Sequence, residues 1–153
     1  VSRQLVYESG GWKENLLMNQ DGDFFFFLLM IAAKAYFISN AKVYYRIGEY
    51  STVSKANSEN KLLSLLDSYI SYKENALIHK DNLRVRKALS YNFTYFIYLY
   101  GNKYPALYKK AKDQVENLGV GFQLRKKSPR IRFVSKILGF ENLMAIRRII
   151  SKE

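Results

Sequence analysis

Residues 10–33 read GGWKENLLMNQDGDFFFFLLMIAA, which is a glycine turn, a short polar segment and then ten consecutive apolar residues. The apolar run predicts a buried helix from about Gly22 to Lys34. Asp21 lies just ahead of this run, where its carboxylate would interact with the positive end of the helix dipole. Such a carboxylate can cap the helix, or it can take a proton from a substrate as a general base.

Short elements are expected on both sides of this stretch. A helix is predicted from Arg3 to Ser9, before the glycines. Two strands are predicted near Tyr36–Ser39 and Lys42–Arg46, because both segments are rich in Tyr, Phe, Ile and Val, with Asn40 and Ala41 as the turn between them.

The chain becomes helical in pattern from Ser58 onward, since apolar residues then recur at spacings of three and four. Glycine, proline and polar capping residues divide this region into predicted helices over 58–78, 82–100, 105–118, 129–138 and 141–151. The predicted fold class is therefore mainly α with a small β element (α+β). Its predicted domains are residues 1–55, a helical accessory domain over 56–121 and basic amphipathic helices over 122–153.

The composition sets limits on the chemistry. With 48% apolar and 16% aromatic residues in 153 positions, the chain can form a packed core. The absence of cysteine excludes disulfides and thiolate metal sites, and His79 is the single histidine, so no metal site is expected in this segment. The longest apolar run has ten residues, whereas a membrane-spanning helix needs about 20.

The net charge of +12 is concentrated near the C-terminus. Residues 122–153 contain nine Lys or Arg against two Glu, interleaved with apolar residues. This pattern is typical of basic amphipathic helices, whose expected partner is an anionic membrane surface. The tyrosine-rich segment 91–100 raises the alternative of nucleic-acid stacking, but its aromatic residues surround the helix instead of forming one platform. We therefore expect them to be buried between helices and expect no nucleic-acid partner.

Three blocks, residues 1–12, 21–25 and 41–48, resemble in order and spacing the second half of the catalytic domain of an inverting family 2 glycosyltransferase of GT-A type. The first block ends in the Gly-Gly-Trp turn, the second holds the acidic pair that opens a helix, and the third ends in an aromatic-Arg element. The resemblance covers residues 1–55. Gln20 stands where the family usually has an acidic residue, and Asp21 aligns with the family's proposed base.

The resemblance implies a hexosyltransferase-like enzyme of bacterial cell-envelope polysaccharide synthesis. Its nucleotide-sugar half, with an Asp-x-Asp motif and Mg²⁺ or Mn²⁺, is expected before Val1, so this chain is expected to be an inactive C-terminal fragment that holds no cofactor. Its partners would be a nucleoside diphosphate sugar and a glycan or lipid-linked acceptor. The enzyme would lie in the cytoplasm, peripherally on the inner face of the membrane.

The resemblance also assigns roles to single residues. Asp21 is expected to be the catalytic base and Arg46 to contact the donor diphosphate, while the acceptor is expected to contact Gly11, Trp12, Gln20 and Asp23. Each role has a structural alternative. Asp21 can serve as a cap, Asp23 can complete the first helical turn, Trp12 can be a packing residue and Arg46 can be a solvated strand end.

Two further expectations concern the chain as a whole. An exposed former domain interface would promote self-association, so a homo-oligomer is expected. The competing functional hypothesis is a helical adaptor module that binds a membrane surface or a protein through its basic end.

Overall fold

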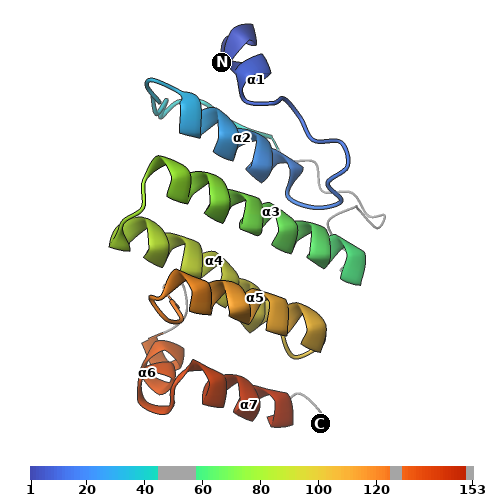
Figure 1. Cartoon of the computed structure of the whole chain (residues 1–153), viewed down its shortest axis with the longest axis vertical. Coiled ribbons are helices and arrows are strands. Elements are labelled where there is room, and N and C mark those ends of the chain that lie inside the picture. Colours follow the sequence, from blue (N-terminus) through green and yellow to red (C-terminus); the bar gives the residue numbers. More distant parts are fainter. Residues whose placement is uncertain (45–57, 125–128, 151–153) are drawn as a thin grey trace. The chain divides into compact units, whose positions relative to one another are not determined.

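The computed structural model describes residues 1–44, 58–124 and 129–150, and all its regular elements are helices. Figure 1 shows these helices in chain order. They are α1 (Arg3–Glu8), α2 (Gln20–Ile31), α3 (Glu59–His79), α4 (Leu83–Tyr100), α5 (Pro105–Leu118), α6 (Pro129–Leu138) and α7 (Phe140–Ile150). The mainly α part of the predicted fold class is confirmed.

The helix boundaries follow the local chemistry that predicted them. The side chain of Asn82 accepts a hydrogen bond from the backbone N–H of Val85 at 2.9 Å, which caps the start of α4. Pro105 is the first residue of α5, where its missing N–H costs nothing. Gly119 ends α5 with a φ of 66°, a left-handed conformation that favours glycine.

The predicted β element is wrong within the described residues. Tyr36–Ser39 forms no strand, and neither do residues 42–44, while the rest of the second predicted strand lies outside the described residues. Tyr36 and Phe37 are 80% and 94% exposed. High β-propensity reflects packing on a half-buried, paired surface, and no strand in the described part of the chain supplies such a surface to these exposed residues.

The chain divides into two compact units, residues 1–68 and 69–153. Unit 1 contains α1, α2 and the first part of α3, and α1 packs on α2. Its buried apolar side chains come from α2 and α3, namely Leu28, Leu62, Leu65 and Leu66. Unit 1 therefore has a small core.

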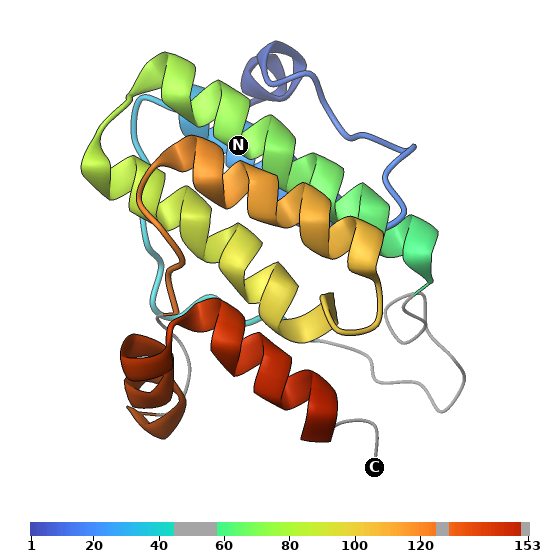
Figure 2. The same ribbon diagram turned by 60° about the horizontal axis from the view of Figure 1, so that its bottom comes forward.

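Unit 2 is built around the pair α4 and α5, which lie side by side in Figure 2 and are joined by a short turn. Gly101 allows this turn, because a Cβ there would lie 2.7 Å from the carbonyl oxygen of Ile97 and 2.8 Å from the ring of Tyr108. Of the side chains that the structure describes in this unit, thirteen apolar ones are buried: Tyr72, Leu89, Phe93, Phe96, Ile97, Tyr98, Leu107, Ala111, Val115, Leu118, Phe140, Leu143 and Met144. The expected burial of the aromatic residues of α4 is thus confirmed for Phe93, Phe96 and Tyr98, whereas Tyr91, Tyr95 and Tyr100 are only half-buried.

The connection after α5 is fastened to α4 by two hydroxyl groups. Ser90 Oγ donates to the carbonyl oxygen of Gly121 at 2.6 Å, and Thr94 Oγ1 accepts from the N–H of Gln123 at 3.0 Å. Phe122, which lies between these two anchored residues, stacks on Phe140 with ring centroids 4.5 Å apart. These contacts explain why two buried polar residues occur on α4, and they fix the start of α7.

Candidate functional site

The Gly-Gly turn has a fixed backbone conformation that favours glycine at both positions. Gly10 and Gly11 both have left-handed φ values, 84° and 70°, and their N–H groups donate to the carbonyl oxygens of Tyr7 and Val6 at 3.1 Å. Side chains are strained at such φ values, so two successive glycines are favoured. The turn ends α1 and carries the chain to Trp12.

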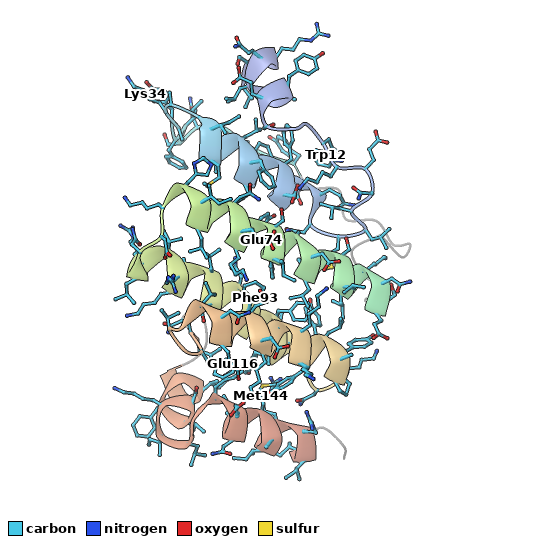
Figure 3. The ribbon with its side chains drawn as sticks, in the orientation of Figure 1. Trp12, Lys34, Glu74, Phe93, Glu116 and Met144 are labelled. Atoms are coloured by element: carbon cyan, nitrogen blue, oxygen red, sulfur yellow. The ribbon has the colours of Figure 1, made fainter. Side chains whose placement is uncertain are left out.

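Trp12 combines packing with exposure. Its ring lies 5.4 Å from that of Phe24 on α2, centroid to centroid, at an angle of 49°. The residue remains 52% exposed, and Figure 3 shows it beside the N-terminal part of α2. The indole therefore packs on α2, as the structural alternative expects, and part of its surface stays exposed; contact with an acceptor stays a prediction.

Buried Asp23 and partly exposed Lys13 form an ion pair that ties the turn to α2. Lys13 Nζ lies 2.9 Å from Asp23 Oδ2 and 3.2 Å from Oδ1, and 4.3 Å from the ring centroid of Phe27. Asp23 is 1% exposed. Its carboxylate thus faces an ammonium group inside the unit, and we assign it to holding the turn in place, not to contact with an acceptor.

Asp21 lies two residues away in a different environment. The helix begins at Gln20 with Asn19 in the cap position, so the expectation that Asp21 precedes the helix is corrected by two residues. Asp21 is exposed, and its Oδ1 accepts a hydrogen bond from the N–H of Gly22 at 2.9 Å. An exposed carboxylate in the first turn is stabilised by the helix dipole and can be reached by a substrate hydroxyl.

Asn19 explains why α2 starts where it does. It has a left-handed φ of 69°, and its Nδ2 donates to Ser68 Oγ at 3.0 Å. A Cβ on Gly22 would lie 2.2 Å from Asn19 Oδ1, so the glycine leaves room for the Asn19 side chain. Gln20 Nε2 donates to the carbonyl oxygen of Leu16 at 2.7 Å and closes the preceding loop.

Sequence reasoning missed three of these polar contacts, made by Lys13, Asn19 and two serines of α3. Besides the bond from Asn19, Ser64 Oγ accepts from the N–H of Leu17 at 3.0 Å. One signal existed for Lys13. An aspartate within an apolar helix needs a counter-charge when it is buried, and Lys13 is the nearest preceding cation in the chain. Nothing local marked the serines, because they lie more than forty residues away.

The predicted contact of Arg46 with a diphosphate lies outside the described residues. Within the described ranges no group of three or more side chains could hold a metal ion. In the same part of the chain no helix is long and apolar enough to cross a membrane.

The site that emerges is one exposed carboxylate, Asp21, in the first turn of α2, and the ion pair between Lys13 and Asp23 fastens this turn to the segment that carries the half-exposed indole of Trp12. Comparison of the chain with protein families, with curated protein sequences and with solved structures found no match. The chemistry of the residues themselves therefore has to support any function.

Proposed function

We propose that this chain is the C-terminal part of an inverting glycosyltransferase similar to family 2, with Asp21 as its general base. One observation carries the proposal. Of the two carboxylates that flank Gly22, Asp23 is neutralised inside the unit, whereas Asp21 faces solvent at a helix start that follows the Gly-Gly-Trp turn. The motif resemblance singles out the same carboxylate.

In the proposed reaction, Asp21 accepts the proton of an acceptor hydroxyl while that oxygen attacks the anomeric carbon of the donor sugar. The new bond forms on the face opposite the diphosphate. The bond from the anomeric carbon to the diphosphate breaks, and the nucleoside diphosphate leaves with the electron pair. The configuration at the anomeric carbon is therefore inverted.

The remaining roles are proposed from the resemblance, together with the contacts of the described residues. Trp12 would support the acceptor through its exposed ring surface, and Gly11 would let the chain pass close to it. Gln20 holds the loop before the helix through Leu16 and so positions the first turn. Arg46 would offset charge on the departing diphosphate, a role that rests on the resemblance alone.

Donor binding belongs to a nucleotide-sugar half that we expect before Val1. A divalent cation such as Mg²⁺ or Mn²⁺ would neutralise the donor diphosphate there. The described residues contain no cluster suited to hold it, so no step is assigned to it in this chain.

The test is transfer by the longer polypeptide that includes the donor-binding half. Asp21→Asn should lower the transfer rate by roughly 10²–10⁴-fold, the usual contribution of a general base, and leave donor affinity unchanged. Glu14→Gln is the matched control, because Glu14 is an exposed carboxylate of the neighbouring loop, and it should keep wild-type activity. Retention of activity by Asp21→Asn would leave Asp21 with a purely structural role.

A second variant tests acceptor contact. Trp12→Ala should raise the acceptor KM by about tenfold, since it removes the exposed stacking surface, and should leave the donor KM unchanged. A change in the donor KM alone would mean that Trp12 contacts the donor and not the acceptor.

A further inference from the structure

Helix α7 has a broad apolar side that is buried only in part. Phe140, Leu143 and Met144 are buried, and Figure 3 shows Met144 on the side of α7 that faces α5. Ile149 and Ile150 are 72% and 66% exposed, and Ile146 is 40% exposed. Ile146 and Ile150 follow Leu143 by three and seven residues and so widen the buried side, whereas Ile149 lies across the helix from it. The apolar surface of α7 is therefore wider than its buried part, and the exposed isoleucines are open to a partner.

Helix α6 adds to this surface. Phe133 and Ile137 are 64% and 63% exposed, and their spacing of four residues places them on one face of the helix. In Figure 2, α6 and α7 lie next to each other, and the two helices are in contact. We call the five residues Phe133, Ile137, Ile146, Ile149 and Ile150 the outer face.

Some charged residues near the outer face have partners inside unit 2, and others are exposed. Arg147 is engaged inside unit 2, since its guanidinium donates to the carbonyl oxygen of Tyr98 and its Cζ lies 3.8 Å from that ring centroid. Lys136 and Arg148 are exposed. Glu141 forms an ion pair with Lys112 of α5 at 2.5 Å, so its negative charge is compensated. The two helices that carry the outer face therefore also carry exposed cations, Lys136 on α6 and Arg148 on α7.

We propose that the outer face binds the surface of an anionic lipid bilayer, with its apolar side chains at the headgroup boundary and with Lys136 and Arg148 on lipid phosphates. Basic amphipathic helices bind such surfaces through buried apolar area together with attraction to anionic lipids. A second copy of the chain is a poorer partner, because residues 122–153 carry nine Lys or Arg against two Glu and would repel their own kind. This proposal is independent of the role of Asp21.

Vesicle flotation tests the electrostatic part. The chain should float with vesicles of phosphatidylcholine and phosphatidylglycerol and remain unbound with phosphatidylcholine alone. The double variant K136E/R148E should bind at least roughly tenfold more weakly, because two attractive charges become repulsive. The control K80E/K109E makes the same change in net charge, two cations replaced by two anions, at exposed lysines away from the outer face, and it should bind like the wild type.

Equal loss of binding in the two double variants would show attraction by net charge only and would overturn the proposal. Absence of binding to the mixed vesicles would do the same. Far-ultraviolet circular dichroism identifies variants that fail to fold.

A second pair of variants tests the apolar part. F133S/I149S removes two outer-face residues, and I78S/L83S removes two side chains that are 82% and 60% exposed on α3 and α4. Only the first pair should weaken flotation, by roughly tenfold or more, because each apolar side chain contributes through the area that it buries. If F133S/I149S instead abolishes a concentration-dependent dimer and leaves flotation unchanged, the outer face joins two copies and the lipid proposal is wrong.

Discussion

The two units are stabilised in different ways. Among its described residues, unit 2 has thirteen buried apolar side chains, with Phe93, Phe96 and Ile97 at 1% exposure or less. The described part of unit 1 has four buried leucines, and polar contacts hold its loops: Lys13 to Asp23, Asn19 to Ser68 and Leu17 to Ser64. Unit 1 thus combines a small apolar core with specific polar contacts, whereas unit 2 is stabilised by an ordinary helical core.

This difference has a consequence for function. Polar contacts fix the positions of particular atoms, whereas apolar packing mainly supplies stability. A catalytic or binding residue needs a fixed position, so a segment with many specific polar contacts and a small core is the better candidate for a site. The contrast also predicts that the two units respond differently to mutation.

The largest effect is expected in unit 2. Phe93→Ala removes a fully buried ring and should lower the free energy of unfolding by about 3–5 kcal/mol. Circular dichroism reports unfolding of all helices, whereas the single tryptophan, Trp12, reports on unit 1 alone. Phe133→Ala, at a position that is 64% exposed, is the control and should change stability by less than about 0.5 kcal/mol. If the fluorescence and dichroism transitions shift together, the units unfold as one and the comparison fails.

The next effect is expected in unit 1. Lys13→Met leaves Asp23 as a buried carboxylate without its ammonium partner and should cost about 1–3 kcal/mol, seen in Trp12 fluorescence. The double variant K13M/D23N removes the charge as well and should recover part of the loss. If the loss in the double variant equals the sum of the losses in Lys13→Met and Asp23→Asn alone, the two side chains do not stabilise each other and the ion pair does not hold the turn.

A smaller effect is expected at the start of α2. Asn19→Ala loses the hydrogen bond to Ser68. It also places alanine, which has no polar side chain to stabilise the left-handed φ, at this position, so the free energy of unfolding should fall by about 1–2 kcal/mol. Asn19→Gly loses the same bond without the backbone strain and should cost less. Chemical denaturation followed by Trp12 fluorescence measures both, and a larger cost for Gly than for Ala would contradict the left-handed assignment.

The smallest effect at neutral pH concerns Tyr69 in unit 2. Burial, with a further contribution from Tyr100, Tyr91 and Tyr95, raises its pKa from 10.0 to about 12. The folded state therefore keeps a proton that the unfolded state releases, so the stabilisation is complete below pH 10 and is lost as pH rises through 12. Tyr69→Phe should flatten this alkaline loss of stability, and an unchanged pH profile would mean that Tyr69 ionises as freely in the folded state as in the unfolded one.

Most of the fold could be predicted from local sequence. The starts and ends of α4 and α5 depend on Asn82, Gly101, Pro105 and Gly119, which act on the residues next to them. The strand predictions failed over residues 36–39 and 42–44, because strand formation depends on a partner strand and on burial, which a short run of β-branched and aromatic residues does not specify. Local rules therefore succeeded where the deciding contacts are local.

The candidate site was predictable only in part. Asp21 and Trp12 were marked by their place in a recognisable order of motifs, and the structure leaves both exposed. The separation of Asp21 from Asp23 was not predictable, because it depends on Lys13 and on which side of α2 faces the core. Asn19 was overlooked as the cap because its backbone is left-handed and its side chain bonds to distant Ser68.

The central claim is that, of the two carboxylates beside Gly22, only Asp21 is open to an incoming substrate. Carbodiimide coupling of an amine to the folded chain, read by mass spectrometry of its peptides, tests this directly, with exposed Glu14 as the internal reference. We expect Asp21 to react at a rate similar to that of Glu14 and Asp23 to be protected until the chain is unfolded. Protection of Asp21, or equal reaction of Asp21 and Asp23, would contradict the account.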